Sequence, residues 1–520
     1  MPDPWKRRLF GIFSFVLLSL LLVSLDLIPS LAKAESAHLV TDGSPSSTVV
    51  SSKDAILQGY GVEKRDTPYT GDTLYKGDGY VSFFYDYDPN SGKSDGTATF
   101  KVNVPTAGLY KLSLGYYIPA DTGSKDTSFE VNGTMAESIT LVPPPGGAVV
   151  NEKSVSKIML NAGTNEVTFS RGWGYYGIEY VKVEFASLPA VSPPKLHQIE
   201  KKLVNPNATV ETKALMGYLV DVYGNKILSG QHTLEDAQWI KDQTGKYPAM
   251  LSTDMMDYSP SRVERGTTPT EVDKAIQWAK EGGIVTLVWH WNAPKGLHDI
   301  PGKEWYRGFY TEATTFDVQY ALNHPESDEY QLILRDIDAI AVQLKRLQDA
   351  HVPVLWRPLH EAEGRWFWWG AQGPESAKQL YRIMYDRLTH YHHLNNLIWV
   401  WNSENPEWYP GDDVVDIVSV DIYNPAANYG PSIGKYDNLV DLVQDKKLVA
   451  LSENGPIGDP ELLQAYSAHW LFFSTWTGDF IRNGQYNSLD HLIKVFNSDY
   501  VITRDELPQD LFASYKNEMK

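Results

Sequence analysis

The fold is decided by the stretch Trp356–Glu361, which reads Trp-Arg-Pro-Leu-His-Glu and follows the short apolar run Val352–Leu355. A second apolar run, Leu448–Leu451, is followed two residues later by Glu453. A buried strand has little structural use for a terminal glutamate, because burying an unpaired charge is costly. A (β/α)8 barrel does use such residues, since its catalytic groups project from the C-terminal ends of its strands. The two stretches therefore predict a barrel with Glu361 and Glu453 at its site.

The rest of the C-terminal part fits this barrel. Apolar runs typical of strands alternate with amphipathic helical segments such as 270–282, 329–350 and 375–393, and eight such β/α units indicate a TIM-type fold. Polar and aromatic residues follow six successive strands, which is hard to explain by structure alone. The eight expected strands are 226–229, 249–252, 284–288, 352–355, 397–400, 417–420, 448–451 and 471–474.

The N-terminal part has a different pattern. Segments 98–104, 109–114, 166–169 and 178–183 alternate between apolar and polar residues and are separated by turn signals, which predicts a β-sandwich. Four parts of the chain are expected: a signal peptide over 1–34, a sandwich module over 35–188, a Pro-rich linker over 189–204 and the barrel over 205–520.

The first 34 residues have the features of a secretory leader. A basic region, Lys6–Arg8, precedes the apolar stretch Leu9–Val23, and Ala32–Ala34 supplies small residues for cleavage, so we expect a secreted protein that starts near Glu35. An uncleaved membrane anchor is the alternative. The chain has no cysteine, which excludes disulfides and thiolate metal sites. We expect a monomer that does not bind a membrane after processing.

The charge and the two glutamates indicate the kind of ligand. A net charge of −19 argues against nucleic acid or anionic membranes as partners and favours a neutral polymer. Two carboxylates at strand ends can cleave a glycosidic bond without a cofactor. The aromatic run Trp366–Trp369 is suited to stacking on sugars. Arg357, inside a strand end, is expected to pair with a carboxylate such as Glu453, either to keep it ionised or as a purely structural ion pair.

Longer motifs resemble one family. Arg357–Glu361 followed by Gly364–Gly370 resembles the acid/base motif of family 26 glycoside hydrolases, chiefly β-mannanases, and Ser452–Gly455 is similar to its nucleophile motif. The pair Ala362-Glu363 departs from the family, whose members often have a polar, uncharged pair there, and Glu363 could alter a sugar subsite. The stretches Trp289–Asn292 and Ser419–Tyr423 also match in type and order.

The resemblance implies a retaining mechanism. Glu453 would be the nucleophile and Glu361 the proton donor and general base, with His360 and Tyr423 setting their environments by hydrogen bonding. His290 and Trp366 would line the sugar subsites, and Trp476 would form a platform under the sugar at the cleavage point. For His290 the alternative is a structural histidine at the barrel end. The residues expected to bind substrate are His290, His360, Trp366, Tyr423 and Trp476, with Arg357 and Tyr423 supporting the nucleophile.

The N-terminal module resembles family 35 carbohydrate-binding modules. The resemblance depends on turn and strand units at 79–81, 107–110, 131–133, 160–165 and 174–181. Trp173, Tyr175 and Tyr176 lie on a Gly-rich loop, where they either stack on sugars or pack at the sandwich edge. Such modules often hold a structural calcium through early glutamates. Ser51–Asp54 stands at that place here, which argues against the usual calcium site.

Three functions compete. The first is an endo-acting β-1,4-mannanase, mannan endo-1,4-β-mannosidase, with an appended binding module. The second keeps the barrel and mechanism but acts on mixed-linkage glucan or xylan, since the catalytic pair does not select the sugar. The third is a polysaccharide-binding protein without activity, although both glutamates are present.

Overall fold

The computed structural model describes residues 47–67, 75, 77–83, 95–105, 108–119, 123–143, 151–172, 175–186, 197, 199–424 and 426–512. The expected leader and Trp173 lie outside the described residues, as does most of the expected linker. Within the described part, no helix has both the length and the apolar character needed to cross a membrane.

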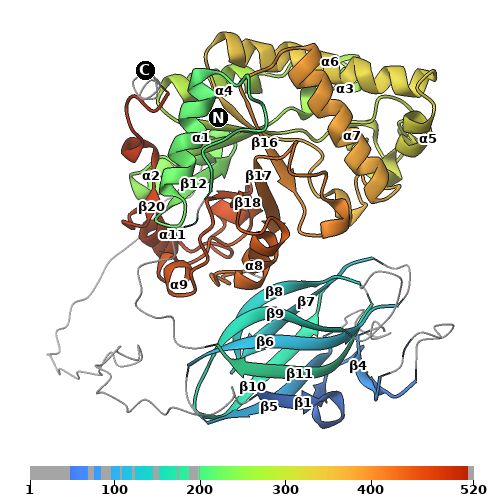
Figure 1. The fold of residues 1–520 in the computed structure, drawn as a ribbon, viewed down its shortest axis with the longest axis vertical. Coiled ribbons are helices and arrows are strands. Elements are labelled where there is room, and N and C mark those ends of the chain that lie inside the picture. The colour runs from blue at the N-terminus through green and yellow to red at the C-terminus, as the bar shows by residue number, and fades with distance from the viewer. Residues whose placement is uncertain are drawn as a thin grey trace, which may run out of the picture. The chain divides into compact units, whose positions relative to one another are not determined.

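The N-terminal module is a sandwich of two antiparallel sheets (Figure 1). One sheet has the order β3-β4-β11-β6-β9, with β1 paired to β11, and the other has the order β2-β5-β10-β7-β8. Alternate residues of the strands, such as Phe100 and Val102, point into a shared apolar core. The strands are β1 Ser47–Ser51, β2 Ile56–Gln58, β3 Glu63–Arg65, β4 Tyr80–Ser82, β5 Thr97–Val104, β6 Gly108–Tyr117, β7 Lys125–Val131, β8 Thr134–Leu141, β9 Asn151–Leu160, β10 Gly163–Arg171 and β11 Gly177–Phe185.

The C-terminal part is a closed parallel barrel, which confirms the predicted fold. The strands from β12 to β19 pair in chain order, and β19 pairs with β12 to close the ring. A short strand that the sequence did not suggest, β20, pairs with β12 outside the ring. The strands are β12 Ile227–His232, β13 Met250–Asp254, β14 Ile284–Val288, β15 Val354–Arg357, β16 Leu397–Asn402, β17 Ile417–Ile422, β18 Leu448–Asn454, β19 Phe472–Thr475 and β20 Val501–Ile502.

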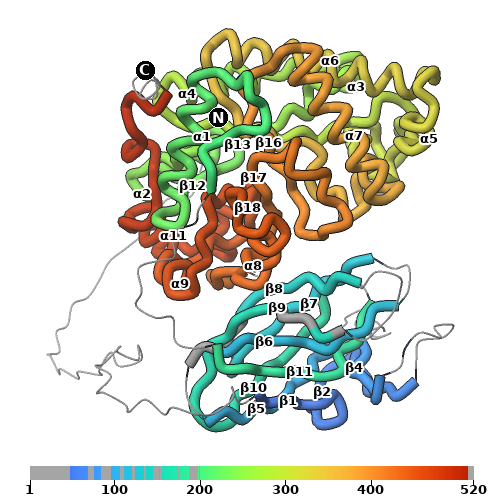
Figure 2. The backbone as a smooth tube through the Cα atoms, viewed as in Figure 1, coloured from blue at the N-terminus to red at the C-terminus, as the bar shows by residue number. Residues whose placement is uncertain are grey.

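Helices surround these strands (Figure 2). The longest, α6, has an apolar face that contains Ile333, Ile337, Ile340 and Leu344, a helical spacing that buries one side against the barrel. The main helices are α1 Val210–Val222, α2 Leu234–Thr244, α4 Glu271–Lys280, α5 Val318–Asn323, α6 Asp328–Asp349, α7 Pro374–Asp386, α8 Ile433–Leu442, α9 Pro460–Ala465 and α11 Leu489–Phe496, and shorter turns are α3 Pro260–Val263 and α10 Asp479–Arg482.

One irregularity in the barrel affects the site. Val420 of β17 pairs with Leu451 of β18, but the next pair is Asp421 with Glu453, so the register skips Ser452. Bulges of this kind redirect side chains and are frequent beside active sites. Here the bulge brings Asp421 and Glu453 level with each other at the C-terminal ends of their strands.

Candidate active site

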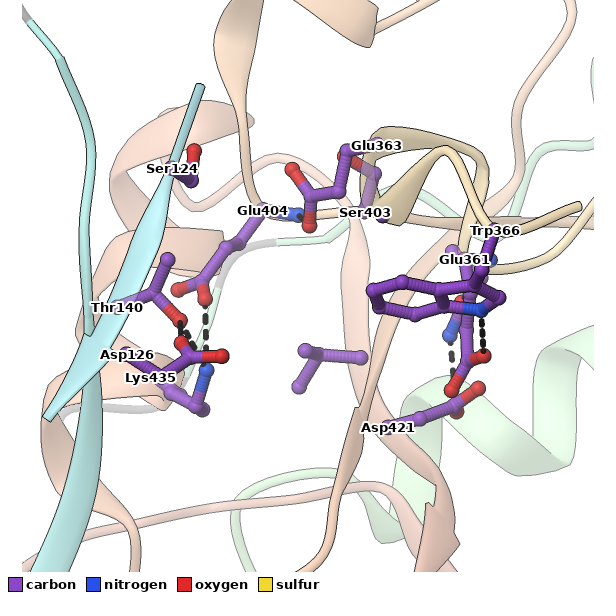
Figure 3. Close-up of a pocket in the computed structure, with 13 residues that line it drawn as sticks. Ser124, Asp126, Thr140, Glu361, Glu363, Trp366, Ser403, Glu404, Asp421 and Lys435 are labelled. Carbon is purple, nitrogen blue, oxygen red and sulfur yellow. Dashed lines mark hydrogen bonds and ion pairs between the residues drawn. The ribbon is translucent and has the colours of Figure 1, made fainter. Parts of the chain in front are cut away.

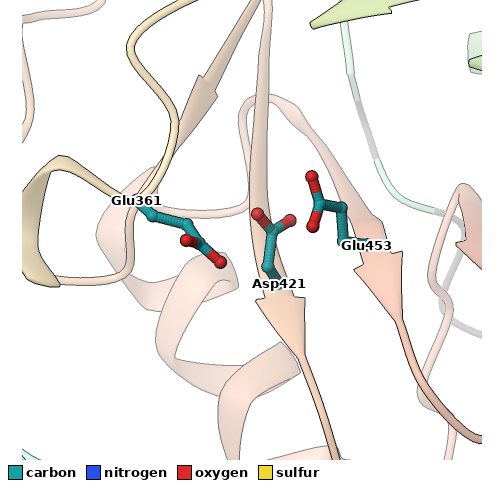
Figure 4. Close-up of side chains that lie close together, drawn as sticks. All are labelled: Glu361, Asp421 and Glu453. Atoms are coloured by element: carbon teal, nitrogen blue, oxygen red, sulfur yellow. The ribbon is translucent and has the colours of Figure 1, made fainter. Parts of the chain in front are cut away.

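Three carboxyl groups meet at the C-terminal end of the barrel. Oxygen atoms of Glu361, Asp421 and Glu453 all lie within 4.8 Å of one another. They come from the loop after β15, from β17 and from β18, and Figure 4 shows the three groups converging. The two glutamates predicted from sequence are therefore brought together, and Asp421 joins them.

Glu453 is held by two donors. Arg357, at the end of β15, forms a buried ion pair with Glu453 and donates to Asp421 at 2.8 Å from its other terminal nitrogen. The hydroxyl of Tyr423 donates to Glu453 at 2.6 Å. Burial opposes the charge on Arg357, but the carboxylates of Asp421 and Glu453 outweigh it and raise its pKa. Glu453 therefore lies beside a buried positive charge and a hydroxyl donor.

Glu361 has the opposite environment. Burial and the nearby charges of Asp421 and Glu453 raise the pKa of Glu361 well above its ordinary value. The indole nitrogen of Trp366 donates to its carboxyl group at 2.9 Å. A carboxyl group of raised pKa beside one that is paired with an arginine is the arrangement expected of an acid and a nucleophile.

Asp421 lies between Glu361 and Glu453 (Figure 4). Its carboxylate accepts hydrogen bonds from Asn402 at 2.9 Å and from Ser452 at 2.8 Å. Burial raises the pKa of Asp421 to about 6, while Arg357 opposes that rise. Asp421 lies in the family-like stretch Ser419–Tyr423, whereas Asn402 lies at the end of the preceding strand β16. Nothing in the sequence indicated that the two side chains would contact each other.

Two histidines form a chain toward the barrel wall. Nδ1 of His290 lies 2.6 Å from Asp254, and Nε2 of His290 lies 3.1 Å from Nε2 of His360. If Nδ1–H of a neutral His290 donates to Asp254, then Nε2 of His290 accepts from Nε2–H of His360. Nδ1 of His360 is buried and has no hydrogen-bond partner. Burial lowers the pKa of His360 well below its ordinary value, so the ring is neutral. The expectation that His360 would hydrogen-bond the acid is therefore wrong, because its ring bonds His290.

The other predicted subsite residues surround the carboxyl groups. Trp366 and Tyr423 each keep 41% of their surface exposed, as expected of side chains that meet a ligand. Trp476, after β19, lies with its ring 4.8 Å from His232 and 6.1 Å from His290. Trp366 and Tyr423 contact Glu361 and Glu453 directly, and Trp476 lies beside the histidine pair.

The spacing of the three carboxyl groups would also suit a metal ion. Hard cations prefer such oxygen ligands. However, Arg357 already pairs with two of the groups, and a cation beside its buried guanidinium would be repelled. The donor set therefore fits proton transfer and nucleophilic attack better than metal binding.

In the module, the aromatic candidates differ. Tyr175 is 47% exposed, with Arg171 lying 5.7 Å from its ring centre. Tyr176 is fully buried and stacks on Phe83 with ring centres 5.0 Å apart. Of the two alternatives for Tyr176, the structure therefore supports packing, because its ring lies in the apolar core just before β11.

A parallel barrel that brings an ion-paired carboxylate within 4.8 Å of a carboxyl group of raised pKa is the site of a glycoside hydrolase. Comparison with known proteins agrees. The model of glycosyl hydrolase family 26 matches residues 204–506, and that of carbohydrate binding module family 35 matches residues 48–186. The chain belongs to glycosyl hydrolase family 26 and carries a family 35 module.

Several known proteins are similar to most of this chain. A mannan endo-1,4-beta-mannosidase of Thermothelomyces thermophilus is 47% identical over 92% of this chain and 94% of its own. The mannan endo-1,4-beta-mannosidase B of Piromyces sp is 36% identical over 86% of this chain and 76% of its own. The crystal structure of a Podospora anserina GH26-CBM35 β-(1,4)-mannanase is similar with a TM-score of 0.62 and 46% identity, covering 90% of this chain and 99% of that one.

Proposed function

We propose that this protein is an endo-β-1,4-mannanase that acts by double displacement. The observation that carries the proposal is the approach of Glu361 and Glu453 to within 4.8 Å. Retaining enzymes separate their carboxyl groups by about 5–5.5 Å, whereas inverting enzymes need about 6.5–9.5 Å to admit a water molecule. The short separation supports a covalent glycosyl-enzyme.

In the first step, Glu453 attacks the anomeric carbon and Glu361 gives its proton to the departing oxygen. Arg357 and Tyr423 keep Glu453 ionised and aim its oxygens. The raised pKa of Glu361 keeps the proton available. The carbon–oxygen bond to the leaving sugar breaks as the bond to Glu453 forms.

In the second step, Glu361 takes a proton from water as that water attacks the same carbon. The bond to Glu453 breaks, and the sugar leaves with its original configuration. Formation of the covalent ester removes one negative charge beside Glu361, so its pKa falls and it becomes a better base. The same residue thus serves as acid and then as base.

Mannan is the proposed substrate because the similar proteins are named as mannanases. A 33% identical mannanase from a termite symbiotic protist was solved with a gluco-manno-oligosaccharide. This supports a substrate polysaccharide that contains glucose as well as mannose units. The test is hydrolysis of mannan, mixed-linkage glucan and xylan by the purified protein. Preference for mannan with early release of long oligosaccharides would support the proposal, and preference for either other polymer, or release of single sugars only, would overturn it.

Three further parts of the proposal concern the setting of the enzyme. We propose secretion with cleavage near Glu35, which the N-terminal sequence of protein from culture fluid would test. We propose a monomer, testable by sedimentation. The catalytic steps use only protein groups, so a chelator should leave activity unchanged, and loss of activity that added metal restores would contradict this.

A further inference from the structure

The loop that carries Glu361 has an unusual backbone. Leu359, Glu361 and Arg365 have φ angles of 52°, 52° and 61°, in the left-handed region that residues with side chains rarely adopt. Such conformations persist only where surrounding contacts hold them. The question is which contacts hold this loop.

Glu363 makes one set of these contacts. Its carboxylate accepts hydrogen bonds from the backbone N–H of Asn405 at 3.1 Å and of Glu404 at 3.4 Å, in the segment that follows β16. Figure 3 shows this side chain directed toward Glu404 and Ser403 and away from Glu361. Glu363 therefore connects the loop of the acid to the next strand end, and it does not reach toward the reacting atoms.

The segment that receives Glu363 is itself anchored. The carboxylate of Glu404 accepts from Lys435 at 2.8 Å and from Asn438 at 2.9 Å, both on α8. Burial opposes the charge on Glu404, but Lys435 lowers its pKa. The contact of Glu363 is thus made to a fixed part of the barrel.

A second anchor holds the start of the loop. The backbone N–H of Glu361 donates to Asn402 at 2.8 Å, at the end of the same strand β16. At the far side of the loop, the ring of Trp366 lies across Gly364, where a side-chain carbon would come within 2.1 Å of the indole. Between these two points, Glu363 is the side chain that ties the middle of the loop to the barrel.

We propose that Glu363 is a positioning residue for the acid, holding the strained loop 361–365 against residues 404 and 405 so that Glu361 keeps its place beside the leaving oxygen. The inference deepens the proposed function, since it rests on Glu361 as the acid. Loss of the contact lets the loop relax and shifts Glu361. A misplacement of about 1 Å can reduce a rate about 100-fold.

The test compares two substrates in Glu363→Ala, Glu363→Asp and Glu363→Gln. Cleavage of a manno-oligosaccharide needs the proton of Glu361. In a dinitrophenyl manno-oligosaccharide, the dinitrophenolate leaving group departs without that proton. We expect Glu363→Ala to lose about 100-fold in kcat on the former and less than about threefold in the glycosylation step on the latter, with KM little changed. Glu363→Gln keeps one of the two acceptor oxygens but turns its amide NH2 toward the other backbone N–H, so it should recover only part of the rate. Glu363→Asp should show a smaller form of the same split.

The control is Glu375→Ala, because that side chain is 85% exposed and lies on α7. It should leave both rates unchanged. Equal losses on both substrates in the Ala and Asp variants, or full activity on the oligosaccharide, would overturn the positioning role. Glu361→Ala in the same assay tests the acid itself. If Glu361→Ala loses activity equally on both substrates, the proposed acid is wrong. If Glu361→Ala loses activity mainly on the oligosaccharide but the Glu363 variants do not, only the positioning role is wrong.

Discussion

Asp421 stands opposite Glu453 in the register of β17 and β18, directly after the bulge at Ser452. Two carboxylates at this spacing would repel each other, and Arg357 donates to both. Glu453, the proposed nucleophile, is therefore one member of a charged cluster. Its reactivity depends on Arg357 and Asp421 as well as on its own position.

Glu453→Ala should abolish turnover while the protein still folds. The shortened side chain leaves space on the face from which Glu453 attacks, so azide should restore cleavage of an activated glycoside and give a glycosyl azide of inverted configuration. Product analysis by NMR checks this. Glu461→Ala, at an 80% exposed position, is the control. Near-normal activity in Glu453→Ala would remove it from the nucleophile role.

Glu361→Ala should cripple hydrolysis of polysaccharide by about 10²–10⁴-fold, the usual contribution of general acid catalysis. The first step on a dinitrophenyl glycoside should be spared, since that leaving group needs no proton. The glycosyl-enzyme should then accumulate, because water has lost its base, and a burst with a low KM should be seen in stopped-flow traces. If Glu363→Ala gave this burst and Glu361→Ala did not, the acid would be misassigned.

The pH dependence of stability should reveal Glu361. A carboxyl group whose pKa is raised by folding stabilises the native state below its ordinary pKa, and that contribution is lost as pH rises through the raised value. Glu361→Gln cannot ionise, so its Tm should exceed that of the wild type by a margin that grows from pH 4 to pH 8. Activity should fall over the same pH range, because the proposed proton donor ionises. A constant difference in Tm would contradict the raised pKa.

Arg357→Met should lower both stability and activity. Removing one partner of a buried ion pair costs about 3–5 kcal/mol, because the other charge stays buried and unpaired. Here Asp421 and Glu453 would both lose their cation. The double variant Arg357→Met/Asp421→Asn should recover part of the free energy of unfolding, measured in urea, but little activity. Wild-type activity in Arg357→Met would show that the ion pair is only structural.

Tyr175→Ala should weaken retention on insoluble mannan and leave hydrolysis of soluble oligosaccharides unchanged, because the exposed ring lies in the module. Tyr176→Ala is the informative contrast. Truncating that buried ring should cost about 3–5 kcal/mol of stability, as other large aromatic truncations do. Pull-down on insoluble mannan and thermal melts distinguish the two, and unchanged retention in Tyr175→Ala would remove it from the binding surface.

Much of the barrel could be predicted from sequence because its strands are short apolar runs. The helices between them have apolar residues that recur at helical spacing. All eight expected strands are present, and the pairing of Arg357 with Glu453 followed from the cost of a buried charge. The skipped register at Ser452 could not be predicted, since a bulge depends on the neighbouring strand. For Tyr175 and Tyr176 the sequence left sugar binding and packing both open, because adjacent loop residues can face opposite ways, and the structure buries only Tyr176.

The left-handed backbone at Glu361 has a consequence for how such an enzyme changes over time. Glycine would fit this conformation with less strain, and a neutral side chain would remove the repulsion from Asp421 and Glu453. Selection for thermal stability alone would therefore tend to discard the residue proposed as the acid. Heat-resistant variants obtained without an activity screen should be checked first at position 361.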